Sequence, residues 1–139
     1  MKNELSVSVV VTTYKRLDRL VNCIAAVQGQ TMPVQEIIVI HDGPDDDFDR
    51  FMQQKYRDQI ESGNIKALTT PSWEGRPAPG RNLGLRLAQS HYISFCDDDD
   101  IWMPQKVEAQ LKYMVDNNAV DALFSEYIPY FEGGHIRLG

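Results

Sequence analysis

The chain has 139 residues, of which 42% are hydrophobic and 24% charged, and its formal net charge is −6. This length predicts one domain that buries about two-thirds of the surface exposed by the unfolded chain. Because no basic stripe is available to neutralise phosphates, the composition disfavours nucleic acid as a partner. The first residues include no long apolar region and no stretch approaches membrane-spanning length, so a soluble, cytoplasmic protein is expected.

Segments typical of strands and of helices alternate along the chain. Strands are expected at residues 7–11, 37–40, 65–68, 92–96 and 122–128, and helices at residues 16–28, 48–60, 81–89 and 104–117. This alternation predicts an α/β fold, with a mainly parallel sheet flanked by helices on both faces. Ligands of such folds bind where the strands end. The candidate site loops are therefore residues 12–15, 41–47, 69–80 and 97–102.

The two cysteines, Cys23 and Cys96, show no metal-ligand spacing. Each lies in an apolar stretch, the first on an expected helix and the second on an expected strand. Both are interpreted as small core residues of a protein in a reducing compartment.

Four consecutive aspartates, Asp97–Asp100, follow the apolar run at residues 92–96. Adjacent carboxylates repel one another unless a cation relieves them. A hard divalent ion that shares oxygens with a phosphate would do so. The alternative is a solvated acidic turn, which is the usual fate of a charge run. The abrupt join to a core strand, with Ile101 and Trp102 directly after it, favours the site.

The loop after the first expected strand contains Thr12, Thr13, Tyr14 and Lys15. It lacks the glycines of a dinucleotide-binding turn and of a P-loop, which argues against an NAD enzyme and a P-loop NTPase. Tyr14 could lie against a nucleotide base, and the hydroxyl of Thr12 or Thr13 could bond that base. Thr13 could also cap the following helix, and the two roles are compatible.

The second loop begins with His41, Asp42 and Gly43. The carboxylate of Asp42 could accept hydrogen bonds from an imide N–H or a sugar hydroxyl, or it could form a local Asx-turn. His41 has no metal partner at a suitable spacing and is interpreted as structural. The acidic residues at positions 45–49 are expected to place negative charge at the start of the next helix.

The third loop supplies two cations, Arg76 and Arg81. The planar donor fork of arginine suits phosphate, and a pyrophosphate beside an acidic metal site needs such a counter-charge. Arg76 could instead be an ordinary surface residue. Arg81 is expected to begin a short helix whose first turn points into the site, with Asn82 supporting the loop.

Together these loops resemble the family 2 inverting glycosyltransferases, which have a Rossmann-like GT-A fold. The matching segments are residues 9–16, 36–43, 80–85 and 92–104. Each is a weak signal alone, but four in the right order over nearly the whole chain are strong. The resemblance implies one GT-A donor-binding domain over residues 1–139. It also implies a nucleotide-sugar donor, usually a UDP-sugar, bound with Mn²⁺ or Mg²⁺.

The resemblance also implies roles for individual residues. Thr12 and Tyr14 would hold the base, Asp42 would bind uracil, and Arg81 would assist the base or the phosphates. Thr12 stands where the family commonly has proline, and His41 stands where it commonly has a further aspartate.

The D-x-D motif of the family falls on Asp97 and Asp99. Asp99 is the expected metal ligand, Asp98 would face the sugar or the ribose, and Asp100 could cap the following turn. The register within the four aspartates stays open at this point.

Members of the resembled family are considerably longer, and their second half supplies the acceptor pocket and the general base. Glu126 and Glu132 come late enough in the chain to be considered, but neither is assigned as that base. The expectation is a donor-binding part whose full-length form transfers sugar to a saccharide or lipid-linked acceptor in cell-envelope polysaccharide synthesis. That form could lie at the inner face of the membrane, and a truncated sheet could pair with a second copy as a homodimer.

Three other functions are alternatives to the transferase hypothesis. The first is a non-catalytic module that binds a nucleotide or metal and regulates a partner. A receiver-type phosphoryl-transfer domain ranks lower, because Thr69 and Pro129 stand where it needs an aspartate and a lysine. A nucleotidyltransferase would need a glycine-rich basic loop after the first strand.

Overall fold

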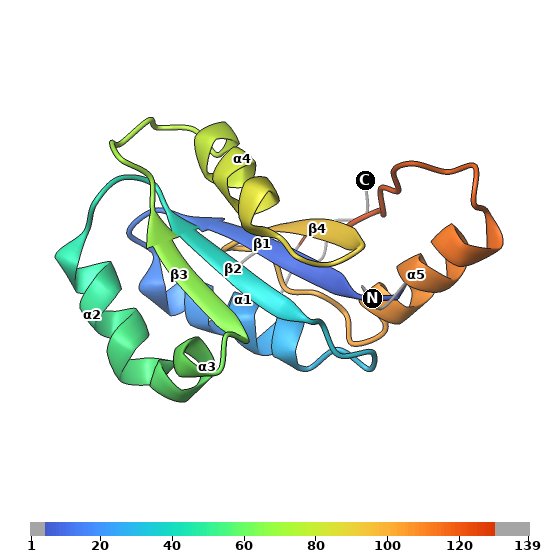
Figure 1. Ribbon diagram of the computed structural model, residues 1–139, viewed down its shortest axis with the longest axis horizontal. Coiled ribbons are helices and arrows are strands. Elements are labelled where there is room, and N and C mark those ends of the chain that lie inside the picture. Colours follow the sequence, from blue (N-terminus) through green and yellow to red (C-terminus); the bar gives the residue numbers. More distant parts are fainter. Residues whose placement is uncertain (1–4, 130–139) are drawn as a thin grey trace.

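The computed structural model describes residues 5–129 and contains one four-stranded parallel sheet in the order β3-β2-β1-β4 (Figure 1). The parallel α/β architecture expected from the sequence is confirmed. The strands are β1 (Val7–Thr13), β2 (Glu36–His41), β3 (Ile65–Thr69) and β4 (Tyr92–Asp97). The helices are α1 (Leu17–Gln28), α2 (Asp46–Lys55), α3 (Arg57–Glu61), α4 (Ala78–Leu87) and α5 (Lys106–Asp116).

Strand β1 lies inside the sheet and pairs in parallel with β2 on one side and β4 on the other. This register places Thr12 opposite Asp97 and Thr13 opposite His41. Since all four strands run the same way, the loops that follow them gather at one edge of the sheet.

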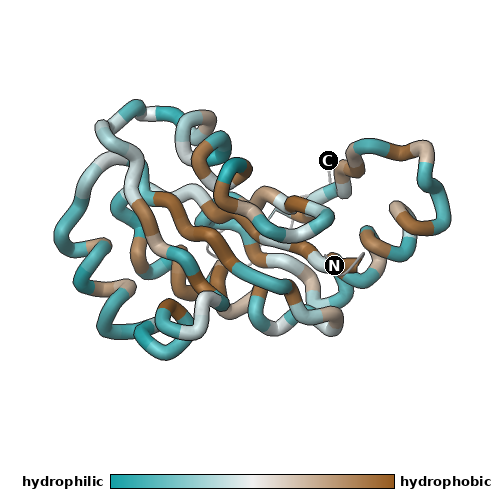
Figure 2. The backbone as a smooth tube through the Cα atoms, in the orientation of Figure 1, coloured by the Kyte–Doolittle hydropathy of each residue, from teal (hydrophilic) through white to brown (hydrophobic). Residues whose placement is uncertain are grey.

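Helices cover both faces of the sheet. In Figure 1, α1, α2 and α3 lie on one face and α4 lies on the other. The strands form an apolar centre between these layers, as the brown segments of Figure 2 show. The larger core joins β1 and β2 to α1, α2 and the start of α5, while Val10, Ile38 and Ile40 form a smaller core beneath α4.

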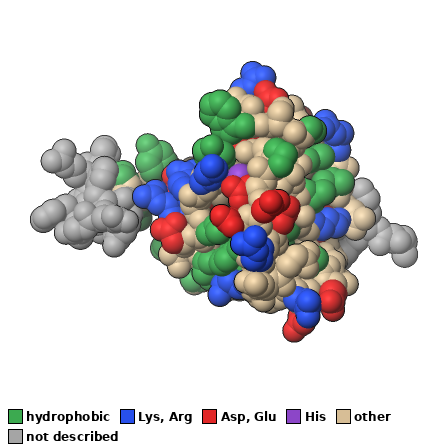
Figure 3. Space-filling view, turned by 90° about the vertical axis from the view of Figure 1, so that its left-hand side faces the viewer, with side chains coloured by type: hydrophobic (Ala, Val, Ile, Leu, Met, Phe, Trp, Pro, Cys, Tyr) green, Lys and Arg blue, Asp and Glu red, His purple; other side chains and the backbone are tan. Residues whose placement is uncertain are grey.

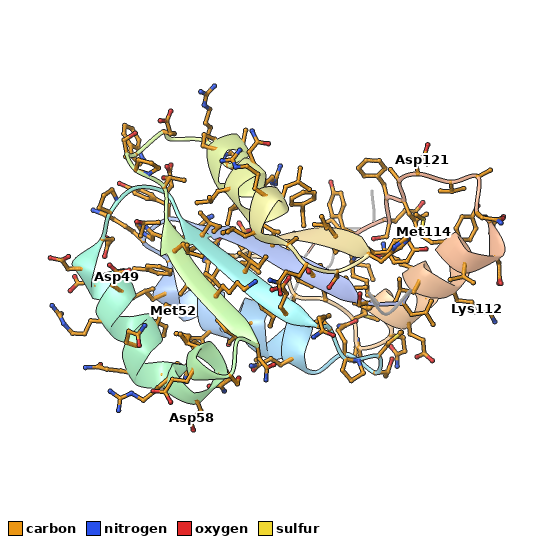
Figure 4. The ribbon with its side chains drawn as sticks, in the orientation of Figure 1. Asp49, Met52, Asp58, Lys112, Met114 and Asp121 are labelled. Atoms are coloured by element: carbon orange, nitrogen blue, oxygen red, sulfur yellow. The ribbon has the colours of Figure 1, made fainter. Side chains whose placement is uncertain are left out.

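Helix α2 shows how a helix presents one apolar stripe to the sheet. Met52 is fully buried and points from α2 toward the sheet, whereas Asp49 projects away from it (Figure 4). The expected acidic start of this helix is confirmed, since Asp45 caps it by accepting a hydrogen bond of 2.8 Å from the Phe48 N–H. That hydrogen bond lowers the pKa of the Asp45 carboxyl.

Three expected helices begin or end elsewhere by two or more residues, among them α4, which spans Ala78–Leu87 where residues 81–89 were expected. The helix expected at residues 48–60 is divided at Tyr56, whose φ of −121° interrupts it between α2 and α3. Pro104 does not open α5, because its carbonyl accepts a hydrogen bond from the Thr31 N–H. The buried side chain of Gln30 instead accepts from the Val107 N–H at 3.0 Å and satisfies the start of α5.

The fifth strand expected at residues 122–128 is wrong. Residues 120–129 have no regular secondary structure, and Phe124 and Tyr127 are 92% and 86% exposed. The segment has strand-forming residues, but strand propensity is expressed only against a paired neighbour. Val115 on α5 is also exposed.

Strand β4 exists where expected but is not fully buried. It is an edge strand in which Cys96 is buried and Phe95 is 45% exposed. No helix within residues 5–129 is long and apolar enough to cross a lipid bilayer.

A buried charge network lies where the strands begin, at the end of the sheet opposite the site loops. Glu36 is 3% exposed and accepts hydrogen bonds of 2.6 Å from Ser8 and 2.7 Å from the Gln89 N–H, and it pairs with Lys66 at 2.6 Å. Burial alone would raise the pKa of Glu36, but these three partners outweigh it and hold the pKa below its usual value. This network is a structural element of the sheet.

We expect Glu36→Gln to lower the free energy of unfolding at pH 7 by about 1–3 kcal/mol, because hydrogen bonds to a charged group are lost. Since folding lowers the pKa, the contribution is present above the pKa of the unfolded chain and is lost as the pH falls through the folded value. Urea denaturation at pH 7 and at pH 3 measures both effects. The control is Glu61→Gln. Glu61 is exposed, and its Oε1 lies 4.0 Å from Nε of Arg57. An equal loss at both pH values would contradict the charge-based account.

Gly84 allows α4 to lie close to β1, since a Cβ at this position would overlap the side chain of Val10. We expect Gly84→Ala to destabilise the fold by about 1–2 kcal/mol, because overpacking outweighs the gain in helix propensity. The control is Leu85→Ala on the same helix, which is half-exposed and should cost less. Chemical denaturation that showed Gly84→Ala to be stabilising would contradict the close approach.

Candidate functional site

Charged and aromatic side chains gather at the edge where the parallel strands end. Figure 3 faces this edge and shows acidic side chains grouped beside lysine or arginine side chains. The groups come from the loops after β1, β2, β3 and β4, as the sequence predicts for a ligand site.

Asp97 ends β4 and is held by the helix that covers one face of the sheet. Nη2 of Arg81 donates to Oδ1 of Asp97 at 2.7 Å, and the Thr12 hydroxyl lies 3.5 Å from the same oxygen. Arg81 is not the first residue of α4, since its N–H bonds the Pro77 carbonyl within the first turn. Thr12, Arg81 and Asp97, three of the predicted site residues, are therefore brought together.

Asp98 is held from the side of α1. It is fully buried, and its Oδ2 accepts hydrogen bonds from the Thr13 hydroxyl at 2.8 Å and from Nε of Arg16 at 3.1 Å. Nη2 of Arg16 lies 2.5 Å from Oδ1 of Asp98. A cap on α1 was one of the two roles considered for Thr13. Instead its hydroxyl binds Asp98, and Arg16 precedes the helix without a side-chain cap.

The remaining two aspartates are nearer to solvent. The side chain of Asp99 is 41% exposed. Its Oδ2 lies 3.3 Å from Nη1 of Arg16. The backbone N–H of Asp100 bonds the Asp97 carbonyl at 3.0 Å and closes the turn. Burial and the charges of Asp97 and Asp99 raise the pKa of Asp100. The carboxylate repulsion expected from the sequence is therefore present at this turn.

A pair of thiols lies directly beneath the acidic turn. Sγ of Cys23 is 3.4 Å from Sγ of Cys96, and both side chains are buried, as expected of small core residues. The hydrogen bond with Cys23, together with burial, raises the pKa of Cys96. Each thiol also lies 3.5 Å from the Asp97 carbonyl. The sequence did not reveal this contact, because the two residues are 73 positions apart.

His41 holds the loop after β1. Its buried ring binds the Gly43 carbonyl through Nδ1 at 2.8 Å, and its Nε2 accepts from the Lys15 N–H at 3.2 Å. A neutral ring with the proton on Nδ1 satisfies both contacts. Lys15 has a φ of 50°, so this hydrogen bond stabilises a backbone conformation that non-glycine residues rarely adopt. These contacts agree with the structural role expected for His41.

Asp42 fastens the loop after β3 to the end of β2. Its Oδ1 accepts from the Glu74 N–H at 2.9 Å, and its Oδ2 accepts from the Gly75 N–H at 2.8 Å. These donors lie more than thirty residues away, so the carboxylate does not act in the local Asx-turn considered above. Arg76 of the same loop is exposed and lies 3.8 Å from Glu74, which agrees with a surface role.

The fastened loop brings an exposed tryptophan to the site. The Trp73 ring is 6.2 Å from the ring of Tyr14, and the two residues are 64% and 41% exposed. Sequence reasoning did not single out Trp73, because it stands in an irregular loop without periodicity. Its position depends on the Asp42 hydrogen bonds and on Gly43, whose φ of 85° and lack of Cβ let the Trp73 backbone approach.

The structure thus defines a class of protein: a parallel α/β domain with an acidic, arginine-flanked carboxyl edge and an exposed aromatic pair. Residues 8–139 match the family model described as glycosyl transferase family 2. The chain belongs to this family.

Relatives agree with this assignment, and a solved structure shares the fold. The chain is 36% identical over 118 residues to an uncharacterized glycosyltransferase of Rickettsia conorii, covering 85% of this chain and 18% of that protein. It is 31% identical over 121 residues to the Escherichia coli UDP-Glc:alpha-D-GlcNAc-diphosphoundecaprenol beta-1,3-glucosyltransferase WfgD. This match covers 87% of this chain and 45% of WfgD. The structure of S. aureus TarS 1-349 in complex with UDP-GlcNAc superimposes with a TM-score of 0.68 at 20% identity. The superposition covers 81% of this chain and 32% of the TarS chain. The chain thus spans less than half of each of these proteins.

The resemblance to the family implies a divalent cation, and the question is whether the carboxylates of the acidic turn are suited to hold one. No group of three or more acidic, histidine or cysteine side chains within residues 5–129 is arranged to hold a metal. Mg²⁺ sites commonly use one or two carboxylates and complete the shell with phosphate oxygens and water. The exposed carboxylate of Asp99 fits that pattern, with Asp97 beside it.

We expect Asp42→Asn to loosen the loop that carries Trp73. An amide offers one acceptor oxygen where the carboxylate offers two, so one backbone N–H loses its partner, at a cost of about 1–2 kcal/mol. Hydrogen exchange at Glu74 and Gly75 should become faster in the variant. Asp46→Asn, an exposed change at the start of α2, serves as the control. Unchanged exchange at both amides would contradict the fastening role of Asp42.

Proposed function

We propose that residues 1–139 form a single GT-A donor-binding domain of a transferase that takes its sugar from a nucleoside diphosphate sugar, with UDP as the favoured nucleotide. Three features at one edge support this: an aromatic pair suited to a base, arginines suited to a diphosphate, and carboxylates suited to a cation. Of these, the ion pair between Arg81 and Asp97 carries the proposal, because its Nη2 and Oδ1 atoms lie 2.7 Å apart and it joins a guanidinium suited to phosphate to the first carboxylate of the acidic turn.

In this proposal the base lies against Tyr14, near Thr12, and Asp42 offers its remaining acceptor capacity to a uracil N–H. Arg81 binds the phosphates while its partner Asp97 faces the cation. Asp99 is the proposed metal ligand. The contact of Asp98 with the sugar or ribose stays a prediction, and Asp98 is fully buried in the structure.

The proposed reaction is direct displacement at the anomeric carbon with inversion. Mn²⁺ or Mg²⁺ bound at the acidic turn would act as a Lewis acid toward the departing diphosphate. The arginines add fixed positive charge next to that leaving group. Inversion also requires a base that takes the proton of the acceptor hydroxyl. Glu126 is exposed in the segment without regular structure and Glu132 lies outside the described residues, so neither is assigned this role.

The acceptor is proposed to be a saccharide or a lipid-linked saccharide of the cell envelope. This proposal rests on the family and on WfgD, whose name specifies a diphosphoundecaprenol-linked acceptor. Because the chain covers 18% and 45% of the two relatives described, transfer itself is proposed for a protein of their length. A peripheral position at the membrane and a homodimer remain predictions.

Calorimetric titration of the 139-residue chain with UDP, with and without Mn²⁺, tests the donor site. We expect Mn²⁺ to strengthen UDP binding at least about tenfold, or ~1.4 kcal/mol, because the cation and the phosphate share oxygens. Asp99→Ala should abolish this gain, while Asp58→Ala on the outer side of α3 should leave it unchanged. Absence of UDP binding under both conditions would refute a donor site formed by these residues alone.

A further inference from the structure

Arg16 contacts two different aspartates, and none of the residue roles proposed above involves it. Its Nε and Nη2 engage the two oxygens of Asp98 at 3.1 and 2.5 Å, while Nη1 lies 3.3 Å from Asp99. Asp98 is fully buried and is itself held by the Thr13 hydroxyl at 2.8 Å. One side of the guanidinium plane is therefore fixed in the protein, and the other reaches the exposed carboxylate of the acidic turn.

The position of Arg16 is electrostatically unusual. It immediately precedes α1, and a cation at a helix N-terminus opposes the helix dipole. The neighbouring carboxylates offset this cost, and local conflicts of this kind are expected at functional sites. The side chain is also 45% exposed, so Nη1 has access to solvent and to a ligand at the sheet edge.

We propose that Arg16 binds the donor by exchanging partners at Nη1, from Asp99 to a phosphate oxygen of the donor. The hydrogen bond from Nε to Oδ2 of Asp98, together with the ion pair between Nη2 and Oδ1, keeps the guanidinium plane in place during the exchange. The inference rests on the proposed function, because it assumes that a nucleoside diphosphate binds at this edge.

The exchange predicts that cation and nucleotide bind cooperatively. Without nucleotide, the positive charge of Arg16 stands beside Asp99 and weakens its attraction for a cation. With nucleotide, Nη1 bonds the phosphate, and Asp99 becomes available as a ligand. Each of the two then strengthens the binding of the other by the same factor, as linkage requires.

The test uses Arg16→Gln, which removes the charge but keeps a side chain that can hydrogen-bond Asp98. Mn²⁺ binding is measured alone by the electron paramagnetic resonance signal of the free ion, and UDP binding is measured by calorimetry with and without Mn²⁺. We expect Mn²⁺ alone to bind severalfold more tightly than to the wild type. We expect UDP in the presence of Mn²⁺ to bind about tenfold more weakly, because a charge-assisted contact is lost.

These opposite changes separate an exchanging residue from one that merely supports the fold. Arg16→Lys keeps the charge but loses the planar fork. It should therefore leave binding of Mn²⁺ alone at the wild-type level and restore only part of the UDP affinity. Arg50→Gln removes an exposed arginine paired with Asp47 at 3.0 Å on α2 and should change neither affinity.

Loss of both affinities in Arg16→Gln, or a change in neither, would overturn the exchange. If burial of unpaired Asp98 unfolds this variant, the double variant Arg16→Gln with Asp98→Asn removes the buried charge, and the same two opposite changes are expected. A wild-type chain that binds no UDP under either condition would contradict the proposed function itself. UDP binding that persists unaltered in the variants would contradict only the role of Arg16.

Discussion

The parallel pairing of β1 with both β2 and β4 is the constraint on which the rest of the structure depends. It places Thr13 opposite His41 and Thr12 opposite Asp97, so three loops distant in sequence meet at one edge. The same pairing buries both faces of β1 and requires helices on each side. A parallel sheet of this kind ends its strands together, which creates the edge where a ligand can be reached from several loops.

Charge compensation decides the form of the site at that edge. Two adjacent aspartates are neutralised from opposite faces of the sheet, Asp97 by Arg81 of α4 and Asp98 by Arg16 before α1. Asp99 shares Arg16, and Asp100 is left with a raised pKa. The acidic turn is therefore neither a simple solvated loop nor a preformed metal cage. It is a set of carboxylates held by arginines that a phosphate ligand could also engage.

The loop after β3 shows how one polar residue can organise a binding surface. Asp42 fastens the backbone of Glu74 and Gly75, and this fixes Trp73 near Tyr14. His41 orders the neighbouring Lys15 backbone from below. Both residues hold the backbone of a loop from another part of the chain, so the ends of neighbouring strands fix one another.

The sequence by itself determined the α/β class and the positions of the four strands, because apolar periodicity is a local signal, and its strand-end motifs carried the resemblance to the family. It also placed Thr12, Arg81 and Asp97 at one site. Only the tertiary structure decided that residues 122–128 are not a strand, that Cys23 touches Cys96, that Arg16 pairs with Asp98 and that Trp73 lies near Tyr14. Those features depend on partners far apart in the chain, and no local pattern records which distant side chain neutralises, pairs with or holds another.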